Sequence, residues 1–325
     1  MTLQDTEQDY AIALDVGGTV LKAALTGRDD GPLHQARRPT AGTGDPAHVV
    51  AGILDFTREL YDAGTARFGR PPAAAGIVVP GLVDERAGLA VYSANLGWRD
   101  VPLARLVSER LGGVPVALGH DVRAGGLAEG RLGAGAGLSR FLFVALGTGI
   151  AGAIGVDGRM EPGAHGAAGE IGHIVIRPGG VRCGCGQYGC LETVASAAAV
   201  GRAWAAASGT PGATAADATA ALAAGDGRAA SLWREAVDGL ADGLLTTVAL
   251  LDPGAVVIGG GLAEAGETLL DPLRTALAAK ATFHRLPTVV PAALGDSAGC
   301  LGAGLLAWER AGLGPAAPAI AEVTR

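Results

Sequence analysis

One short pattern occurs twice in the chain, and this repeat limits the folds that the chain can adopt. Residues Leu14–Thr19 read LDVGGT, and Val144–Gly149, near the middle of the 325-residue sequence, read VALGTG. Each copy has the composition of a strand, a glycine-rich turn and a return strand. Similarity at such a distance predicts two related domains, each presenting a glycine turn. The copies differ at one acid, because Ala145 stands where the first copy has Asp15.

Apolar runs and helical patterns alternate along the rest of the chain. Short apolar runs at 76–83 and 255–258 predict buried strands, the first running into a turn at Pro80 and Gly81. The periodic runs at 46–68 and 227–251 predict amphipathic helices. This alternation is typical of the α/β class. A hydrophobic content of 49% with 18% charged residues supports a sizeable core.

The chain has no low-complexity linker that would separate two halves. The predicted hinge lies near residues 119–125. We therefore expect a small N-terminal domain made of residues 1–121 plus about 300–325. A large C-terminal domain at 122–299 would carry most of the cysteines.

Charge and hydropathy exclude several classes of partner. The net charge is -7, and no basic stripe is present, which argues against nucleic acid. Residues 1–9 lack the basic start and apolar run of a signal peptide. The weakly charged stretch at 141–156 is short for a bilayer span and is interrupted by glycines, so it predicts two buried strands. We expect a cytoplasmic protein with no membrane partner.

Three of the four cysteines are clustered at Cys183, Cys185 and Cys190, and His173 precedes them. In a reducing cytosol such a cluster favours metal binding over disulfides. Three thiolates and one imidazole are a common tetrahedral zinc set, here with the histidine on the preceding strand. With four protein ligands the zinc would be structural. The alternative is a set of free thiols or a redox pair.

Glycine turns at two places predict anion or nucleotide contacts. Gly17 and Gly18 lie in the expected first hairpin, where positive φ angles would expose backbone N–H groups as an anion nest. Residues Gly259–Gly261 join a strand to a helix, a connection that suits close approach by a nucleotide. Each has a plainer alternative, an ordinary Gly-Gly hairpin and a tight connection.

Four acids are candidates for proton transfer beside these turns. Asp15 lies on the first turn, where it could hold Mg²⁺ through water. Asp121 ends a strand and precedes a helix, where open α/β sheets place chemistry, although a plain helix N-cap is the alternative. Glu170 and Glu192 flank the cysteines and could accept hydrogen bonds from hydroxyls. A base near a phosphate cradle predicts phosphoryl transfer, and several acceptors around a polyhydroxyl ligand predict a sugar site.

Seven motifs occur in one order and resemble the ROK family (repressors, open reading frames, kinases), in particular its glucokinase-like sugar kinases. They are DVGGT, NLGW, HDVRAGGLAE, LGTG, AGEIGH, CGCGQYGCLE and VIGGGL. The resemblance implies an actin-like (ribonuclease H-like) α/β fold of two domains around a cleft. It also implies ATP and Mg²⁺ as cofactors, a structural Zn²⁺ and a homodimer.

The resemblance also implies roles for individual residues. Asp121 matches the catalytic base that deprotonates the sugar hydroxyl. The positions that match sugar contacts are Asn95, His120, Asp121, Glu170, His173 and Glu192. The positions that match zinc ligands are His173, Cys183, Cys185 and Cys190. The positions that match phosphate and nucleotide contacts are Asp15, Gly17, Gly18, Thr19, Gly147, Thr148, Gly149, Gly259, Gly260 and Gly261.

One position departs from the family pattern, because His120 stands where an asparagine usually precedes the base. An imidazole is larger than an amide and spaces its polar atoms differently. The resemblance as a whole still ranks ATP-dependent phosphorylation of glucose to glucose 6-phosphate as the first function, while His120 leaves the choice of hexose open. A kinase for N-acetylmannosamine, fructose or allose is the main alternative. Polyphosphate as donor and a non-catalytic sugar-binding regulator stay open, although a repressor would need an N-terminal DNA-binding domain for which the first strand leaves no room.

Overall fold

The computed structural model describes residues 9–28, 31–40 and 45–314. Its contacts divide the described chain into two compact units. Unit 1 contains the residues up to Ala128, the short segment Pro162–Ala167 and the residues from Asp296 onward. Unit 2 contains Glu129–Glu161 and Ala168–Gly295. The domain boundaries expected from the sequence stay a prediction, and the expectation for a signal peptide at 1–9 concerns mostly residues outside the described part.

Unit 1 is built on a five-stranded sheet in the order β3-β2-β1-β4-β8. The two pairings from β3 to β1 are antiparallel, and those from β1 through β4 to β8 are parallel. A separate small sheet has the order β5-β6-β7. The strands are β1 (Ala11–Val16), β2 (Val20–Thr26), β3 (Pro32–Pro39), β4 (Ala75–Val79), β5 (Leu82–Asp84), β6 (Leu89–Ser93), β7 (Trp98–Val101) and β8 (Val116–His120).

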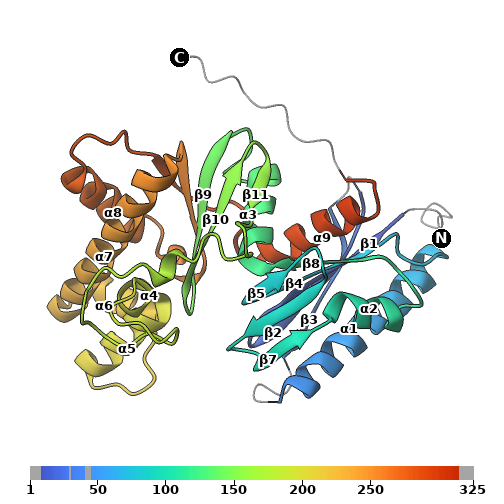
Figure 1. Cartoon of the computed structure of the whole chain (residues 1–325). Coiled ribbons are helices and arrows are strands. Elements are labelled where there is room, and N and C mark those ends of the chain that lie inside the picture. Colours follow the sequence, from blue (N-terminus) through green and yellow to red (C-terminus); the bar gives the residue numbers. More distant parts are fainter. Residues whose placement is uncertain (1–8, 29–30, 41–44, 315–325) are drawn as a thin grey trace. The chain divides into compact units, whose positions relative to one another are not determined.

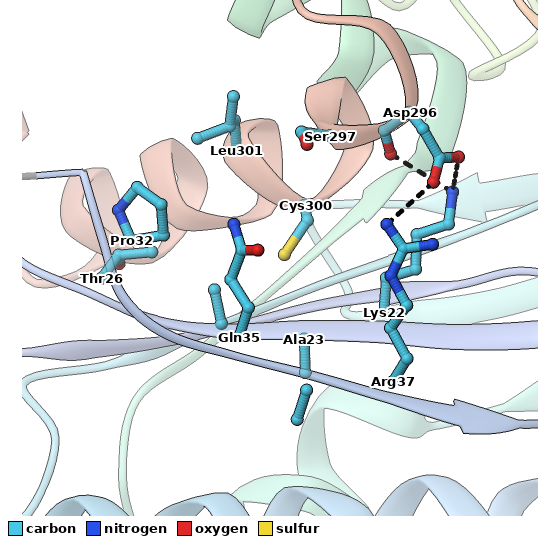
Figure 2. Close-up of a pocket in the computed structure, with 12 residues that line it drawn as sticks. Lys22, Ala23, Thr26, Pro32, Gln35, Arg37, Asp296, Ser297, Cys300 and Leu301 are labelled. Carbon is cyan, nitrogen blue, oxygen red and sulfur yellow. Dashed lines mark hydrogen bonds and ion pairs between the residues drawn. The ribbon is translucent and has the colours of Figure 1, made fainter.

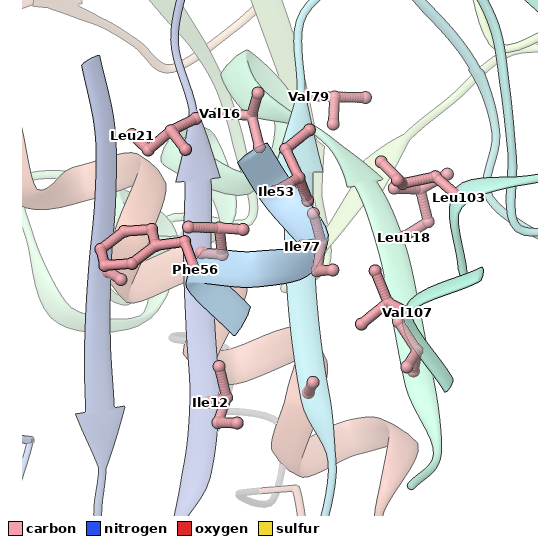
Figure 3. Close-up of a cluster of buried hydrophobic side chains, with 14 of the residues drawn as sticks. Ile12, Val16, Leu21, Ile53, Phe56, Ile77, Val79, Leu103, Val107 and Leu118 are labelled. Atoms are coloured by element: carbon pink, nitrogen blue, oxygen red, sulfur yellow. The ribbon is translucent and has the colours of Figure 1, made fainter. Parts of the chain in front are cut away.

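Helices cover both faces of this sheet, because successive side chains of a strand point to opposite faces. Helices α1 (Pro46–Phe68) and α2 (Leu103–Arg110) pack on the face that carries residues such as Ile12 and Ile77, as Figure 3 shows. The opposite face receives α3 (Asp121–Leu132) and α9 (Ala298–Arg310), which pack near Ala13 and Val78 through small side chains. Figure 1 shows α1 and α2 on one side of this sheet and α9 on the other.

Unit 2 repeats this arrangement with a five-stranded sheet in the order β11-β10-β9-β12-β13. Its strand directions are those of unit 1: antiparallel from β11 to β9, and parallel from β9 through β12 to β13. The strands are β9 (Arg140–Leu146), β10 (Ile150–Val156), β11 (Arg159–Glu161), β12 (Ala255–Gly259) and β13 (Thr288–Pro291). The helices are α4 (Glu192–Ala195), α5 (Ala197–Ser208), α6 (Ala215–Ala223), α7 (Gly227–Leu251) and α8 (Glu267–Lys280), with short 3₁₀ turns at Ile171–His173, Gly261–Ala265 and Gly295–Ser297.

Both copies of the sequence repeat form the hairpins that the pattern predicts. Residue Asp15 pairs with Lys22 across β1 and β2, and Ala145 pairs with Ala151 across β9 and β10. The two hairpins occupy the same place in the two sheets. The internal repeat is therefore a repeat of architecture, as expected for related domains.

The strand that was expected to run into a turn at Pro80 and Gly81 is confirmed. Strand β4 ends at Val79, because Pro80 has no N–H to continue the ladder and Gly81 turns with a φ of +100°. Two other local predictions were wrong. The residue His173 lies in a 3₁₀ turn rather than on a strand. The glycines Gly17 and Gly18 do not have positive φ angles. Glycine is needed at position 17 for a different reason, because a Cβ there would lie only 2.8 Å from the carbonyl oxygen of Val20.

The described part of the chain contains no helix long and apolar enough to cross a membrane.

Candidate functional site

Unit 1 brings together the predicted residues of the first half of the chain. Asp15 lies on β1, where burial and the charge of Asp121 raise its pKa to about 6, while Lys22 acts in the opposite direction. The Lys22 Nζ atom is 4.0 Å from Asp15 Oδ2. Exposed Asn95 lies beside the glycine turn, since a Cβ on Gly18 would be 4.0 Å from its Cβ. The unit therefore gathers an acid, a candidate base and a glycine turn.

The glycine turn of unit 1 is held by hydrogen bonds at both ends. The Gly17 N–H donates to the Val20 carbonyl at 3.0 Å. The Thr40 hydroxyl donates to the Gly17 carbonyl at 2.7 Å, and the Thr40 N–H donates to the carbonyl of Thr19. A turn fixed in this way can present backbone donors to an anion without first being ordered.

Lys22 has a second carboxylate partner at the start of the last helix. Figure 2 shows Lys22 and Arg37 converging on Asp296, with the Arg37 Nη2 atom 3.1 Å from its carboxylate. Cys300 is one of the residues that line the pocket beside this cluster, and the pocket has a volume of about 40 Å³. That volume holds a few water molecules and no sugar. The cluster therefore ties β2 and β3 to the segment that leads into α9 and is no acceptor site.

Asp121 is the first residue of α3, directly after the end of β8. Its Oδ1 atom accepts a hydrogen bond from the Val122 N–H at 2.7 Å and lies 3.5 Å from Nδ1 of His120. The His120 side chain is buried, and its Nδ1 accepts from the Arg123 N–H at 3.3 Å. The carboxylate stays 30% exposed. The imidazole thus caps the helix, and Asp121 is free to meet a substrate.

Unit 2 brings its two predicted nucleotide turns side by side. The turn Gly147–Gly149 follows β9. Gly259 is the last residue of β12, the strand paired with β9, and Gly260 and Gly261 follow it. Gly260 has a φ of +85°, and a Cβ there would lie 2.6 Å from the Leu146 carbonyl oxygen. Only glycine combines this angle with this close approach. The turn Gly147–Gly149 is also held by α5, because the N–H of Ala197 donates to the Gly147 carbonyl.

The predicted metal ligands converge in unit 2. One ligand atom from each of the four residues lies within 4.8 Å of all the others, and the residues are His173, Cys183, Cys185 and Cys190. The Sγ atoms of Cys185 and Cys190 are 3.7 Å apart, and the Cys183 Sγ is 3.5 Å from the His173 Nδ1. Ligands at tetrahedral zinc distances are about 3.8 Å apart for two sulfurs and about 3.6 Å for sulfur and nitrogen. The donor set therefore fits Zn²⁺.

Glycine allows the metal loop to fold tightly against the preceding segment. Val175 and Cys190 form an isolated β-bridge, and so do Arg182 and Tyr188. Gly189 has a φ of +77°, and a Cβ there would lie 1.7 Å from the carbonyl oxygen of Arg177. The side chain of Arg177 anchors the same segment to α7, where its Nη1 atom donates to Asp242 at 2.8 Å.

Both flanking glutamates lie next to the metal ligands. Glu192 Oε1 accepts a hydrogen bond from the Cys183 thiol at 2.8 Å and is 3.7 Å from His173 Nδ1. Its other oxygen is near the glycine turn, since a Cβ on Gly149 would lie 2.8 Å from it. On the other side, Glu170 Oε2 is 3.7 Å from His173 Nε2. The imidazole can therefore bind metal through Nδ1 and donate from Nε2.

Without metal, the thiols differ in acidity. Burial and the hydrogen bond to Glu192 raise the pKa of Cys183, and burial raises that of Cys190. A backbone hydrogen bond from Gln187 lowers the pKa of exposed Cys185. Without metal, Cys183 and Cys190 would thus hold their protons more firmly than a free thiol, and metal binding would have to displace those protons.

Sequence reasoning missed one part of unit 1, the ion pair between Glu85 and Arg123. The two side chains line a pocket of about 590 Å³ together with β5 and the segment 162–166. The Arg123 side chain is buried although it is a cation. A charged residue two positions after a candidate base was the one signal in the sequence, and nothing there pointed to Glu85 as its partner.

The repeated sheet with a glycine turn after the first strand of each copy defines the class of actin-like two-domain kinases. The chain belongs to the ROK family, whose model matches residues 11–310.

Relatives of known activity cover nearly the whole chain. A glucokinase from Streptomyces coelicolor is 32% identical, over 92% of this chain and 97% of the relative. A kanosamine kinase from Amycolatopsis mediterranei is 30% identical, over 92% of this chain and 96% of the relative. The solved structure of a ROK family glucokinase from Streptomyces griseus in complex with glucose and AMPPNP is 31% identical, with a TM-score of 0.78, and covers 92% of this chain and 99% of that one.

Proposed function

We propose that this protein transfers a phosphoryl group from ATP to a hexose, with glucose as the first-ranked acceptor and glucose 6-phosphate as the product. The observation that carries the proposal is the position of Asp121. Its carboxylate is half-buried at the start of α3, directly after a parallel strand, where α/β sheets place chemistry. The glucokinase relatives support the same reaction.

Asp121 would act as the general base. The Val122 N–H and the His120 ring lie at Oδ1, and within the described residues nothing hydrogen-bonds to Oδ2. Oδ2 can therefore accept a hydrogen bond from the sugar hydroxyl and take its proton as the oxygen attacks the γ-phosphorus. Phosphoryl transfer depends on such positioning more than on covalent chemistry.

Glycine-rich turns are the segments proposed for nucleotide contacts. In unit 1 they are Gly17, Gly18 and Thr19, where the N–H of Gly17 is already donated to Val20. In unit 2 they are Gly147–Gly149 and Gly259–Gly261. Asp15 would hold Mg²⁺ through water, because a carboxylate oxygen is a ligand that Mg²⁺ prefers. When bound, Mg²⁺ would neutralise charge on the phosphates.

The residues proposed for sugar contacts are polar donors and acceptors. They are Asn95, His120 and Asp121 in unit 1, and Glu170, His173 and Glu192 in unit 2. The Zn²⁺ would do no chemistry, since four protein ligands leave no open position. It would fix the loop that places His173 and Glu192, which lie within 3.7 Å of each other.

A second acceptor class is favoured by His120, which stands where the family pattern has an asparagine. An imidazole is larger than an amide and spaces its polar atoms differently. A substituted hexose such as N-acetylmannosamine is therefore the second candidate, and fructose and allose also stay candidates. The kanosamine kinase relative supports a broad acceptor range for the family.

We also propose that the protein is cytoplasmic, since a zinc–thiolate site persists in a reducing compartment. A homodimer is proposed from the resemblance to the family alone. Light scattering after size exclusion tests the dimer.

A coupled assay for ADP release with a panel of hexoses tests the function. Glucose should give the highest kcat/KM with ATP, and polyphosphate serves as the alternative donor. Replacement Asp121→Asn should lower kcat by about 10²–10⁴-fold with the Tm nearly unchanged. A near-normal kcat in this variant would exclude Asp121 as the base, and no turnover on any sugar would favour a binding protein.

A further inference from the structure

A single carboxylate oxygen holds two residues on either side of Asp121. Glu85 follows β5 directly, and its Oε1 atom accepts hydrogen bonds from the His120 N–H at 3.4 Å and from Arg123 Nε at 3.0 Å. The Nη2 atom of the same guanidinium is 2.9 Å from this oxygen. Glu85 therefore contacts the last residue of β8 and the third residue of α3, with the candidate base between them.

The guanidinium of Arg123 is fixed at its other end as well. Its Nη1 atom donates to the carbonyl of Gly166 at 2.8 Å. Gly166 belongs to the short segment Pro162–Ala167 of unit 1, and a Cβ there would lie 2.8 Å from the Val83 carbonyl oxygen. The Arg123 side chain is only 5% exposed, whereas that of Glu85 is 39% exposed. The Nε and Nη1 atoms of Arg123 make hydrogen bonds, whereas its buried Nη2 has the Glu85 carboxylate beside it without a hydrogen bond. Removing Glu85 would leave a buried, uncompensated cation, which is costly.

The contacts of Asp121 lead back to the same pair. Its Oδ1 atom accepts from the Val122 N–H and faces the His120 ring, and that ring accepts from the Arg123 N–H. The orientation of the carboxylate is thus set by the first turn of α3. Two groups outside α3 hold this first turn: Glu85, which contacts His120 and Arg123, and the carbonyl of Gly166, which accepts from Arg123.

We propose that Glu85 and Arg123 are positioning residues for phosphoryl transfer, which hold the first turn of α3 so that the Asp121 carboxylate keeps one orientation. The inference rests on the proposed function and deepens it. Neither residue needs to touch a reacting atom. A small displacement of a base costs far more rate than stability, because a shift of about 1 Å can lower the rate about 10²-fold.

The variant Glu85→Gln tests the proposal, since it keeps the shape and removes the charge. We expect kcat with glucose to fall about 10–100-fold, with the KM for ATP changed by less than about twofold. The replacement Arg123→Lys should have a similar effect, because an ammonium cannot reproduce the forked contacts to Glu85 and Gly166. The matched control is Glu109→Gln, which removes one exposed partner of Arg105 and should leave kcat unchanged.

Making the Glu85→Gln change in Asp121→Asn protein as well as in wild-type protein distinguishes a residue that positions Asp121 from one that only stabilises the fold. In Asp121→Asn protein the residual rate should be unaffected by adding Glu85→Gln, because the pair acts through the carboxylate. An equal fall in both backgrounds would overturn the proposal, and so would a normal kcat in Glu85→Gln protein.

If the wild-type chain phosphorylates no sugar, the proposed function is refuted, but the positioning role of Glu85 can still be tested. Hydrogen exchange measures that role directly, without turnover. The amides of Val122 and Arg123 should then exchange faster in Glu85→Gln protein than in the control. Unchanged exchange at these amides would show that Glu85 does not hold the turn.

Discussion

His120 performs two tasks at one position, and they can be separated by substitution. Its Nδ1 atom caps α3 by accepting from the Arg123 N–H, and its ring stands where the family pattern has an amide. An asparagine side chain can keep the cap through its oxygen, whereas an apolar side chain cannot.

We therefore predict different outcomes for two replacements of His120. His120→Asn should keep the Tm within about 2 °C and lower the KM for glucose relative to other sugars. His120→Leu should destabilise the protein by about 1 kcal/mol through the lost cap. Thermal melts and a hexose panel measure both effects. An unchanged sugar ranking in His120→Asn protein would show that this position does not select the acceptor.

Asp15 makes the substrate-free protein sensitive to pH. Its pKa is raised by burial and by Asp121 to about 6, well above the value of an unfolded chain. The folded state then binds a proton that the unfolded state releases between about pH 4 and 6, so this contribution to stability is complete below pH 4 and is lost as the pH rises through 6.

The replacement Asp15→Asn should therefore raise the free energy of unfolding at pH 7 by about 2–3 kcal/mol and leave it unchanged at pH 4. Urea denaturation at both pH values, without ATP or Mg²⁺, gives the comparison. Asp62→Asn is the control, because Asp62 is an exposed partner of Arg58 and should shift stability by less than about 1 kcal/mol. A gain of equal size at both pH values would contradict the assigned cause.

At the scale of elements, the sequence was most informative where local signals agreed. Helix α7 matches its predicted range because Asp226 caps its start and Pro253 follows its end. Strand β3 was missed because it is largely polar and exposed at the edge of the sheet, so it carries no apolar period. The 3₁₀ turn at His173 was missed because it packs against β10, where a Cβ on Gly172 would lie 2.0 Å from the Ile150 carbonyl oxygen, and such a contact has no local sequence signal.

The metal loop is an element whose stability should depend on the ion. Zinc content should equal protein content in material purified without chelator. Cys185→Ser should remove most of the zinc and lower the Tm by about 5–10 °C, as a loss of about 2–3 kcal/mol would. Because Cys185 is exposed, the variant leaves no cavity. Cys300→Ser, outside the cluster, should keep the metal. Full zinc content in Cys185→Ser protein would refute the assigned ligand set.

For the whole molecule, the sequence predicted the duplicated architecture but only part of the candidate site. The LDVGGT and VALGTG segments were visible because glycine leaves a local signature. The set formed by Glu85, Arg123 and Gly166 was not, because its members come from three segments that meet only after folding. Side chains that hold a catalytic residue from outside carry no spacing rule, since their partners are set by tertiary contacts.

Unit 1 is also discontinuous, and its sheet depends on the last helix. Residues from Asp296 onward return to this unit, and α9 packs on the face that carries Val78. The approach is closest at Gly76 on β4, where a Cβ would lie 1.9 Å from the Ala303 carbonyl oxygen. Because the obstructing atoms are backbone, the helix itself would have to move.

We therefore predict that Gly76→Ala weakens the attachment of α9 and destabilises the protein by about 1–3 kcal/mol or more. Gly52→Ala is the matched control: that glycine lies within α1, nothing lies within 4 Å of an added Cβ, and alanine should stabilise the helix by about 1 kcal/mol. Urea denaturation measures both changes. Hydrogen exchange should locate the loss in Gly76→Ala protein at α9, β1 and β4. Equal stability of the two variants would show that α9 does not depend on this contact.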